Sequence, residues 1–150
     1  MQKSEVWQGR SKLPTGSEVW QGRSKLPTGS EVWIEVDLSA IQHNFGVIRS
    51  ALMSDTGIIA VVKANAYGHG LVKVANAIEK SVDMFAVTSM AEALALRAAG
   101  VILSILNLSY TAADMAEEAI ARKITATVYD LDNAKMLHER AAAIKKPLKV

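Results

Sequence analysis

The chain has no cysteine, few aromatic residues and no long apolar run. Without cysteine it has no disulfides of the kind that hold small secreted domains together. No apolar run approaches the roughly 20 residues that a helix needs to cross a bilayer. Residues 1–9 are polar and lack the apolar core of a signal peptide. From these absences we expect a cytoplasmic protein with no membrane partner.

Neither sign of charge dominates the chain. Seventeen Lys and Arg stand against fifteen Asp and Glu, which gives a formal net charge of +2. Residues 1–33 hold the whole of this excess, so the rest of the chain is formally neutral. This removes the electrostatic argument for a nucleic-acid surface, and we predict no nucleic-acid partner. The proportions of apolar and charged residues are those of one globular domain.

The first 33 residues repeat a 13-residue unit. SEVWQGRSKLPTG occupies residues 4–16 and again residues 17–29, and residues 30–33 begin a third copy. Each copy has a Pro-Thr-Gly turn signal and few apolar residues, so the copies cannot bury a continuous core. One interpretation is a tryptophan-bearing interaction arm. We favour an in-frame duplication, and we predict that residues 1–32 form a duplicated polar extension that is disordered.

From residue 33 onward, segments with strand periodicity alternate with segments of helical periodicity. The pattern predicts strands at 33–38, 58–63, 84–88, 102–108, 124–128 and 148–150, and helices at 38–52, 70–80, 89–100, 112–121 and 131–144. Ser89 and Glu92 have the spacing of a capping box, in which each side chain bonds the other residue's backbone N–H. Gly100 is placed to end that helix.

The spacing of these elements predicts an α/β fold. From residue 58, strands start roughly 18 to 26 residues apart, which is the spacing of successive βα units. About four βα units and a fifth strand are visible. A doubly wound sheet fits this count, and so does a partial (β/α)₈ TIM barrel, about half of a complete one. We expect residues 33–150 to be a truncated barrel.

The segment AVVKANAYGHG, residues 60–70, places Lys63 at the end of a strand beside a glycine-rich turn. Residues 59, 61 and 63 share one face and residues 58, 60 and 62 the other. Because both faces are apolar, we expect a parallel strand that is covered on both sides. Ligands bind at this end of parallel strands, and glycines before a helix favour phosphate. On the pattern alone, Lys63 also fits a solvated surface charge.

The same segment closely resembles the pyridoxal-phosphate attachment segment of the alanine racemase family. WIEVDLSAIQHNF (33–45) resembles the family's opening segment, EALALRAAG (92–100) its third-helix signature, and ILNL (105–108) a strand that enters the cofactor pocket. The resemblance covers about residues 33–150. It implies a fold-type III enzyme, with an N-terminal (β/α)₈ barrel followed by a C-terminal β domain, working as a homodimer on a small amino-acid substrate.

The resemblance also implies roles for single residues. Lys63 matches the lysine that forms a Schiff base with pyridoxal 5'-phosphate and serves as an acid or base at the substrate Cα. Tyr67 matches the tyrosine that hydrogen-bonds the cofactor phosphate. Val61 and Leu108 match apolar positions that line the cofactor, although the pattern alone makes them core residues. His69 matches no proton-transfer position, and we expect it to stabilise the turn.

The implied activity is alanine racemase, the interconversion of L- and D-alanine that supplies D-alanine for peptidoglycan. The family's second acid/base, a tyrosine of the partner subunit, matches no residue here, so we expect the chain alone to have little or no activity. Another fold-type III racemase or decarboxylase and a non-catalytic truncated remnant are the alternatives. Decarboxylases normally lack the Tyr-Gly-His-Gly continuation, which disfavours them. No His, Asp or Glu pair has metal-ligand spacing, so we predict no metal.

Overall fold

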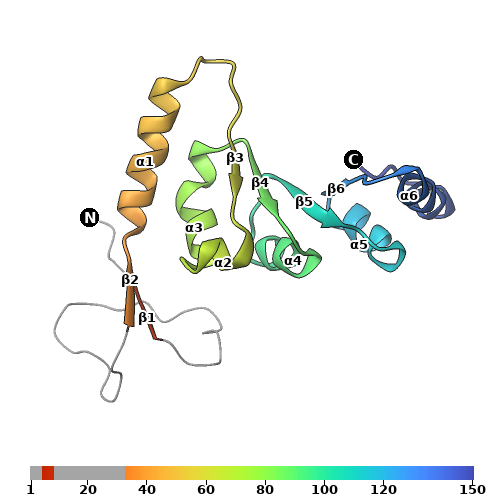
Figure 1. Ribbon diagram of the computed structural model, residues 1–150, viewed down its shortest axis with the longest axis horizontal. Helices are drawn as coiled ribbons and strands as arrows, with labels where there is room; N and C mark the ends of the chain where they lie inside the picture. The colour runs from red at the N-terminus through yellow and green to blue at the C-terminus, as the bar shows by residue number, and fades with distance from the viewer. Residues whose placement is uncertain (1–4, 9–32) are drawn as a thin grey trace.

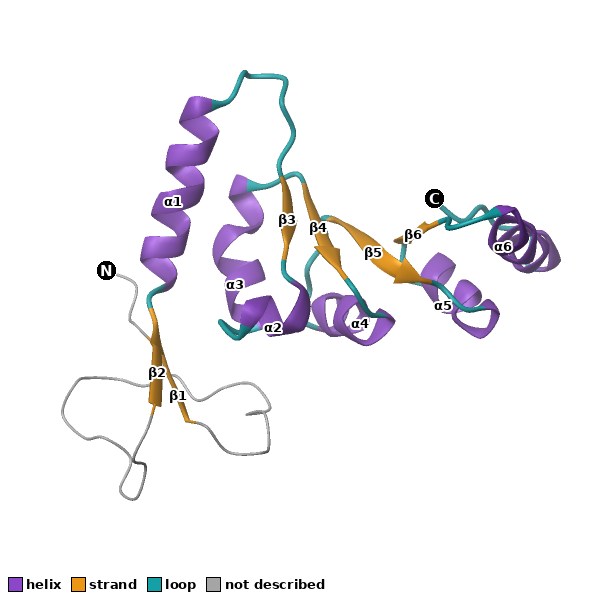
Figure 2. Ribbon diagram, viewed as in Figure 1, coloured by secondary structure: helices purple, strands orange, loops and turns teal. Residues whose placement is uncertain are grey.

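The computed structural model describes residues 5–8 and 33–150 (Figure 1). Its main sheet has four parallel strands, which pair in chain order. They are β3 (Ile59–Val61), β4 (Met84–Val87), β5 (Ser104–Tyr110) and β6 (Ile124–Thr127). Figure 2 shows them side by side in a curved sheet, with helices joining each strand to the next. The predicted α/β order of βα units is confirmed.

Except for α2, which the sequence did not predict, the helices begin close to where the sequence predicts them. They are α1 (Leu38–Ala51), α2 (Lys63–Tyr67), α3 (Leu71–Ile78), α4 (Met90–Ala98), α5 (Ala116–Ala121) and α6 (Leu131–Ala143), with 3₁₀ turns η1 (Glu79–Ser81) and η2 (Ala113–Met115). Asp37, Ser89 and Asp130 cap α1, α4 and α6 by accepting backbone N–H groups of the first turn. Within the described ranges, no helix is long and apolar enough to span a membrane.

The two faces of the sheet differ in burial. Phe85, Val87 and Ile105 point toward the helices and are fully buried, as the strand periodicity predicts. On the opposite face, Ile59 is 52% exposed and Val61 is 40% exposed. The prediction that β3 is covered on both sides is therefore wrong for the described residues, because the helices that pack against β3 all lie on one face of the sheet.

The expected fifth strand at residues 148–150 has no strand structure. Its backbone still approaches the sheet, since the Ala126 N–H donates to the Lys149 carbonyl at 2.9 Å. Leu148 packs against the core between α5, α6 and β6. This single backbone hydrogen bond places the segment beside β6 but does not make it a strand. The prediction of a strand at residues 148–150 is therefore wrong.

Most of the predicted extension, residues 1–4 and 9–32, lies outside the described residues. Residues 5–8 are described, and they form β1 (Glu5–Gln8), which pairs antiparallel with β2 (Trp33–Val36). The expectation of disorder is thus wrong for these four residues, because β2 offers their backbone a partner. β2 confirms the predicted strand at 33–38 in a shorter form and leads through Asp37 into α1.

Candidate active site

Lys63 opens a short helical turn of left-handed geometry. Residues 64–67 have φ angles between 51° and 57°, although none of them is glycine. Left-handed helical backbone costs an L-residue roughly 1–2 kcal/mol, because its Cβ approaches the following carbonyl oxygen. Such a turn persists only where other interactions determine its shape, and strain of this kind concentrates at functional sites.

Hydrogen bonds of the turn's own backbone supply part of this constraint. The Ala66 N–H donates to the Val62 carbonyl at 2.8 Å, and the Gly70 N–H donates to the Asn65 carbonyl at 2.9 Å. Asn65 also accepts the Leu71 N–H on its side-chain oxygen at 2.8 Å, which satisfies an otherwise unpaired donor at the start of α3. Asn65 therefore ties the left-handed turn to the next helix.

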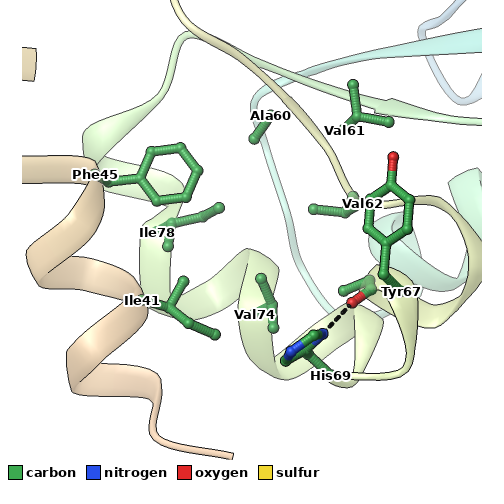
Figure 3. Close-up of a pocket in the computed structure, with 10 residues that line it drawn as sticks. Ile41, Phe45, Ala60, Val61, Val62, Tyr67, His69, Val74 and Ile78 are labelled. Atoms are coloured by element: carbon green, nitrogen blue, oxygen red, sulfur yellow. Dashed lines mark hydrogen bonds between the residues drawn. The ribbon is translucent and has the colours of Figure 1, made fainter. Parts of the chain in front are cut away.

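Two glycines carry the chain from this turn into α3. Gly68 and Gly70 have φ angles of 89° and 96°, which side chains rarely allow. Between them, His69 places Nδ1 2.9 Å from the Ala66 carbonyl oxygen (Figure 3). The predicted turn-stabilising hydrogen bond of His69 is confirmed.

The structure brings three of the predicted site residues to the carboxyl end of β3. Lys63 is half-buried, and among the described residues no hydrogen bond or ion pair engages its amine. Tyr67 is 60% exposed. Its ring lies beside Val62, and its hydroxyl points toward the side of the strand where Val61 lies (Figure 3). An amine and a phenolic hydroxyl thus project from opposite ends of one rigid turn.

Leu108, the fourth predicted residue, lies two strands away on β5. Val61 pairs with Ala86, which pairs with Leu106, so these three residues form one layer of the face opposite the helices, where Ala86 is itself buried. Leu108 is half-buried and lies beyond Asn107, where the register of β5 shifts, so strand alternation does not assign its face. The Tyr129 hydroxyl donates to the Leu108 carbonyl at 2.7 Å and holds the carboxyl edge in place.

Glu92 is a residue of this region that sequence reasoning placed only at a helix start. The Glu92 N–H donates to Ser89 Oγ at 3.2 Å, so the Ser89 half of the capping box forms. The Glu92 carboxylate turns away from Ser89: Oε1 accepts the Asn65 N–H at 3.3 Å and Oε2 accepts the Thr88 N–H at 3.2 Å. The reciprocal half of the predicted box is therefore replaced by a bridge to the Lys63 turn.

The opposite, amino edge of the sheet is fixed by Arg97 and Asp83. Arg97 donates to backbone carbonyls before β5 and β6, and its burial lowers its pKa. The Asp83 carboxylate accepts the Ile58 N–H at 2.6 Å, and this bond, followed by one from Arg49, holds the pKa of Asp83 below its usual value. These contacts set where the strands begin, away from Lys63.

An apolar cavity of about 210 Å³ lies between α1, β3 and α3 (Figure 3). It is lined by Ile41, Phe45, Ala60, Val61, Val62, Ala66, Tyr67, His69, Val74 and Ile78. Two of the predicted site residues, Val61 and Tyr67, line this cavity, whereas Lys63 does not. Among the residues that the structure describes, no three His, Asp or Glu side chains are grouped to hold a metal ion.

Comparison with known proteins identifies the family. Residues 36–150 match the family model described as alanine racemase, N-terminal domain. The chain belongs to the alanine racemase family. Over 118 residues it is 42% identical to alanine racemase 2 of Caldanaerobacter subterraneus subsp. tengcongensis, a match that covers 78% of this chain and 30% of that relative.

The fold of this chain resembles solved structures of racemases. The alanine racemase of Clostridium difficile 630 matches with a TM-score of 0.72 and 41% identity, over 75% of this chain and 30% of that one. A histidine racemase from Leuconostoc mesenteroides subsp. sake matches with a TM-score of 0.67 and 33% identity, over 74% and 30%. The chain thus spans about 30% of the length of these relatives. The predicted family and the partial TIM barrel are confirmed, while the division at residue 33 stays a prediction.

Proposed function

We propose that this chain is the cofactor-holding part of an alanine racemase, which interconverts L- and D-alanine with pyridoxal 5'-phosphate and supplies D-alanine for peptidoglycan. The observation that carries the proposal is the half-buried Lys63, whose amine no described residue engages, at the carboxyl end of a parallel strand. Parallel strands of this fold class bind their ligands at that end. Relatives named alanine racemase, 42% identical over most of this chain, support it.

The residues present fit this cofactor. The Lys63 amine is the group that could link covalently to an aldehyde, and the exposed Tyr67 hydroxyl is a donor for a phosphate oxygen. The exposed Val61 at the end of β3 and the half-buried Leu108 near the carboxyl end of β5 are apolar side chains that suit an aromatic ring. When bound, pyridoxal 5'-phosphate supplies an electron sink for the negative charge that develops at the substrate Cα.

Lys63 then moves a proton at one face of the substrate Cα. The left-handed turn that follows Lys63 helps to hold its backbone at the end of β3, because the backbone and side chain of Asn65 are hydrogen-bonded to Gly70, Leu71 and Glu92. Inversion also requires an acid or base on the opposite face. We assign that group to the partner subunit of a homodimer, so we propose that the 150-residue chain alone has little or no racemase activity. We place the enzyme in the cytoplasm.

Borohydride trapping tests the proposal. Incubating the chain with pyridoxal 5'-phosphate and reducing the mixture should attach the cofactor at Lys63 in preference to other lysines, as read by peptide mass spectrometry. Lys63→Ala should remove this adduct, whereas Lys80→Ala, at an exposed lysine after α3, should leave it unchanged. Adduct spread evenly over the exposed lysines would contradict the proposal and favour a non-catalytic remnant.

A second candidate is a racemase for another amino acid, favoured by the likeness to a histidine racemase at 33% identity. The two candidates differ in which amino acid competes with Lys63 for the cofactor. L-alanine added before reduction should protect Lys63 from trapping more than L-histidine does if the chain is part of an alanine racemase. The reverse order of protection would favour the second candidate, and release of carbon dioxide would indicate a decarboxylase.

A further inference from the structure

The turn that presents Lys63 needs a constraint from outside itself. Four consecutive left-handed residues follow Lys63, and three of them, Ala64, Ala66 and Tyr67, disfavour this backbone on their own, whereas asparagine tolerates it. Bonds within residues 62–71 close the turn. The Val62 N–H, directly before Lys63, donates to the Ala86 carbonyl of β4 at 2.8 Å, and residues 64–67 lie beyond that bond. In the part of the chain that the structure describes, Glu92 is the side chain from another element that hydrogen-bonds the backbone of residues 64–67.

Glu92 is well placed to attach the turn to β4. It lies in the first turn of α4, where Ser89 Oγ accepts its N–H and fixes the start of the helix. One carboxylate oxygen accepts the N–H of Asn65, directly inside the left-handed turn, and the other accepts the N–H of Thr88, directly after β4. One half-buried side chain therefore joins the carboxyl ends of two adjacent parallel strands.

We propose that Glu92 is the positioning residue of the Lys63 turn, which holds the turn, and with it the lysine amine, against the end of β4. The consequence for chemistry rests on the proposed function of Lys63. At 3.3 and 3.2 Å both contacts are long for bonds to a carboxylate, so Glu92 acts through its two acceptor oxygens together rather than through one short bond. Glu92 touches no reacting group; it acts through Asn65.

The chemistry of the carboxylate predicts an order among variants. Both of its oxygens accept, so one group serves two backbone N–H donors at once. Glu92→Gln keeps one acceptor oxygen but turns an amide NH₂ toward the second N–H. Glu92→Ala removes both acceptors. The turn should therefore be held best by glutamate, less by glutamine and least by alanine.

Glu79 provides a matched control. Its Oε1 accepts the Ile102 N–H at 3.0 Å, which is also a carboxylate bond between two elements, and its side chain is half-buried like that of Glu92. This bond lies before β5, at the amino edge of the sheet, away from Lys63. Glu79→Gln and Glu79→Ala thus report the cost of losing such a bond where no lysine turn depends on it.

Amide NMR of the full 150-residue chain tests the contact without any cofactor. In Glu92→Ala the Asn65 and Thr88 amide protons should both move upfield relative to the unsubstituted chain, because both lose a carboxylate acceptor. Glu79→Ala should move the Ile102 amide proton and leave those of Asn65 and Thr88 in place. An Asn65 amide proton with the same shift in Glu92→Ala as in the unsubstituted chain would overturn the proposal.

The rate of borohydride trapping at Lys63 tests the consequence. Glu92→Ala should slow trapping with pyridoxal 5'-phosphate about tenfold, since a small misplacement of a reacting group carries a cost of that order or more. Glu92→Gln should fall between, and Glu79→Ala should match the unsubstituted chain. Equal trapping rates in all four proteins, at equal folded fraction by circular dichroism, would overturn the positioning role.

The two arms separate this proposal from the proposed function. If the unsubstituted chain traps no cofactor at Lys63, the proposed function fails, and the amide shifts of the Glu92 variants alone decide whether Glu92 holds the turn. If Lys63 is trapped but Glu92→Ala reacts at the normal rate, the positioning role fails and the proposed function stands.

Discussion

Arg97 shows how one side chain can fasten several loops at once. Its guanidinium donates to the carbonyls of Val101, Leu103, Arg122 and Lys123 at 2.7 to 3.1 Å. Five N–H groups in a planar fork can serve four acceptors, which the single ammonium of lysine cannot do from one position. The EALALRAAG signature therefore contains two structural anchors, Glu92 at the carboxyl edge and Arg97 at the amino edge.

Arg97→Ala should lower the free energy of unfolding by about 2–3 kcal/mol, because partly buried carbonyls lose a charged donor. Arg97→Lys should cost less, since it restores one of the bonds. Arg140→Ala, at an exposed arginine near the end of α6, should change stability by less than about 0.5 kcal/mol. Urea unfolding followed by circular dichroism measures all three, and an Arg97→Ala chain as stable as Arg140→Ala would refute the anchor.

Asp83 should make the fold sensitive to acid. Its pKa lies below the usual 3.8, first because of the Ile58 N–H bond and then because of Arg49. A carboxyl whose pKa is lower in the folded state contributes stability above its unfolded pKa and loses it as pH falls through its folded pKa. This contribution should therefore stay nearly constant from neutral pH down to about pH 5 and should be lost as the pH falls through 3.8 and below.

Asp83→Asn isolates this contribution. The amide oxygen can still accept from Ile58, but the charge that faces Arg49 is gone. The variant should be less stable than the parent at neutral pH and should lose less stability on acidification. Some acid dependence should remain, because bonds from Ser39 and Ala40 also lower the pKa of Asp37. Urea unfolding at two pH values measures both effects, and an identical loss in both proteins would count against Asp83.

At the scale of elements, periodicity located the helices and strands, but it did not predict the hand of the Lys63 turn. The strand pattern was expected to run to Lys63, whereas β3 ends at Val61. The run Ala-Asn-Ala-Tyr holds no glycine, so local preference favours right-handed backbone there. The Leu71 N–H donates to the Asn65 side chain, and the Asn65 N–H donates to Glu92. The fold brings these residues together, and no short-range sequence pattern predicts the two bonds.

Strand predictions at the ends of the chain failed for a related reason. A strand needs a partner, and its stability depends on the neighbour that it packs against. Residues 148–150 have the apolar pattern, but only one backbone bond joins them to β6. Residues 5–8 have a weak pattern, yet they pair with β2. In both cases the neighbouring strand determined whether the segment became a strand, and the local sequence does not show which strand will lie beside it.

At the scale of the whole molecule, the order of βα units and the family were predictable from strand spacing and from the lysine segment. The uncovered face of the sheet was not, because apolar residues on both faces of β3 predict burial on both. Helices cover the face that holds Ala60 and Val62, and Ile59 and Val61 remain exposed on the other. An apolar sheet face of this kind tends to associate.

We predict that the 150-residue chain self-associates through this face as its concentration rises. Ile59→Lys should shift the population toward monomer, because a charged side chain at a half-exposed position resists burial against another apolar surface. Stability should change little, since Ile59 is 52% exposed.

Ile102→Lys is the control: Ile102 is 87% exposed but lies in the loop before β5, away from this face. Sedimentation velocity over a concentration series distinguishes the proteins. A monomeric parent chain at every concentration, or equal association of parent and Ile59→Lys, would show that the open face does not drive assembly.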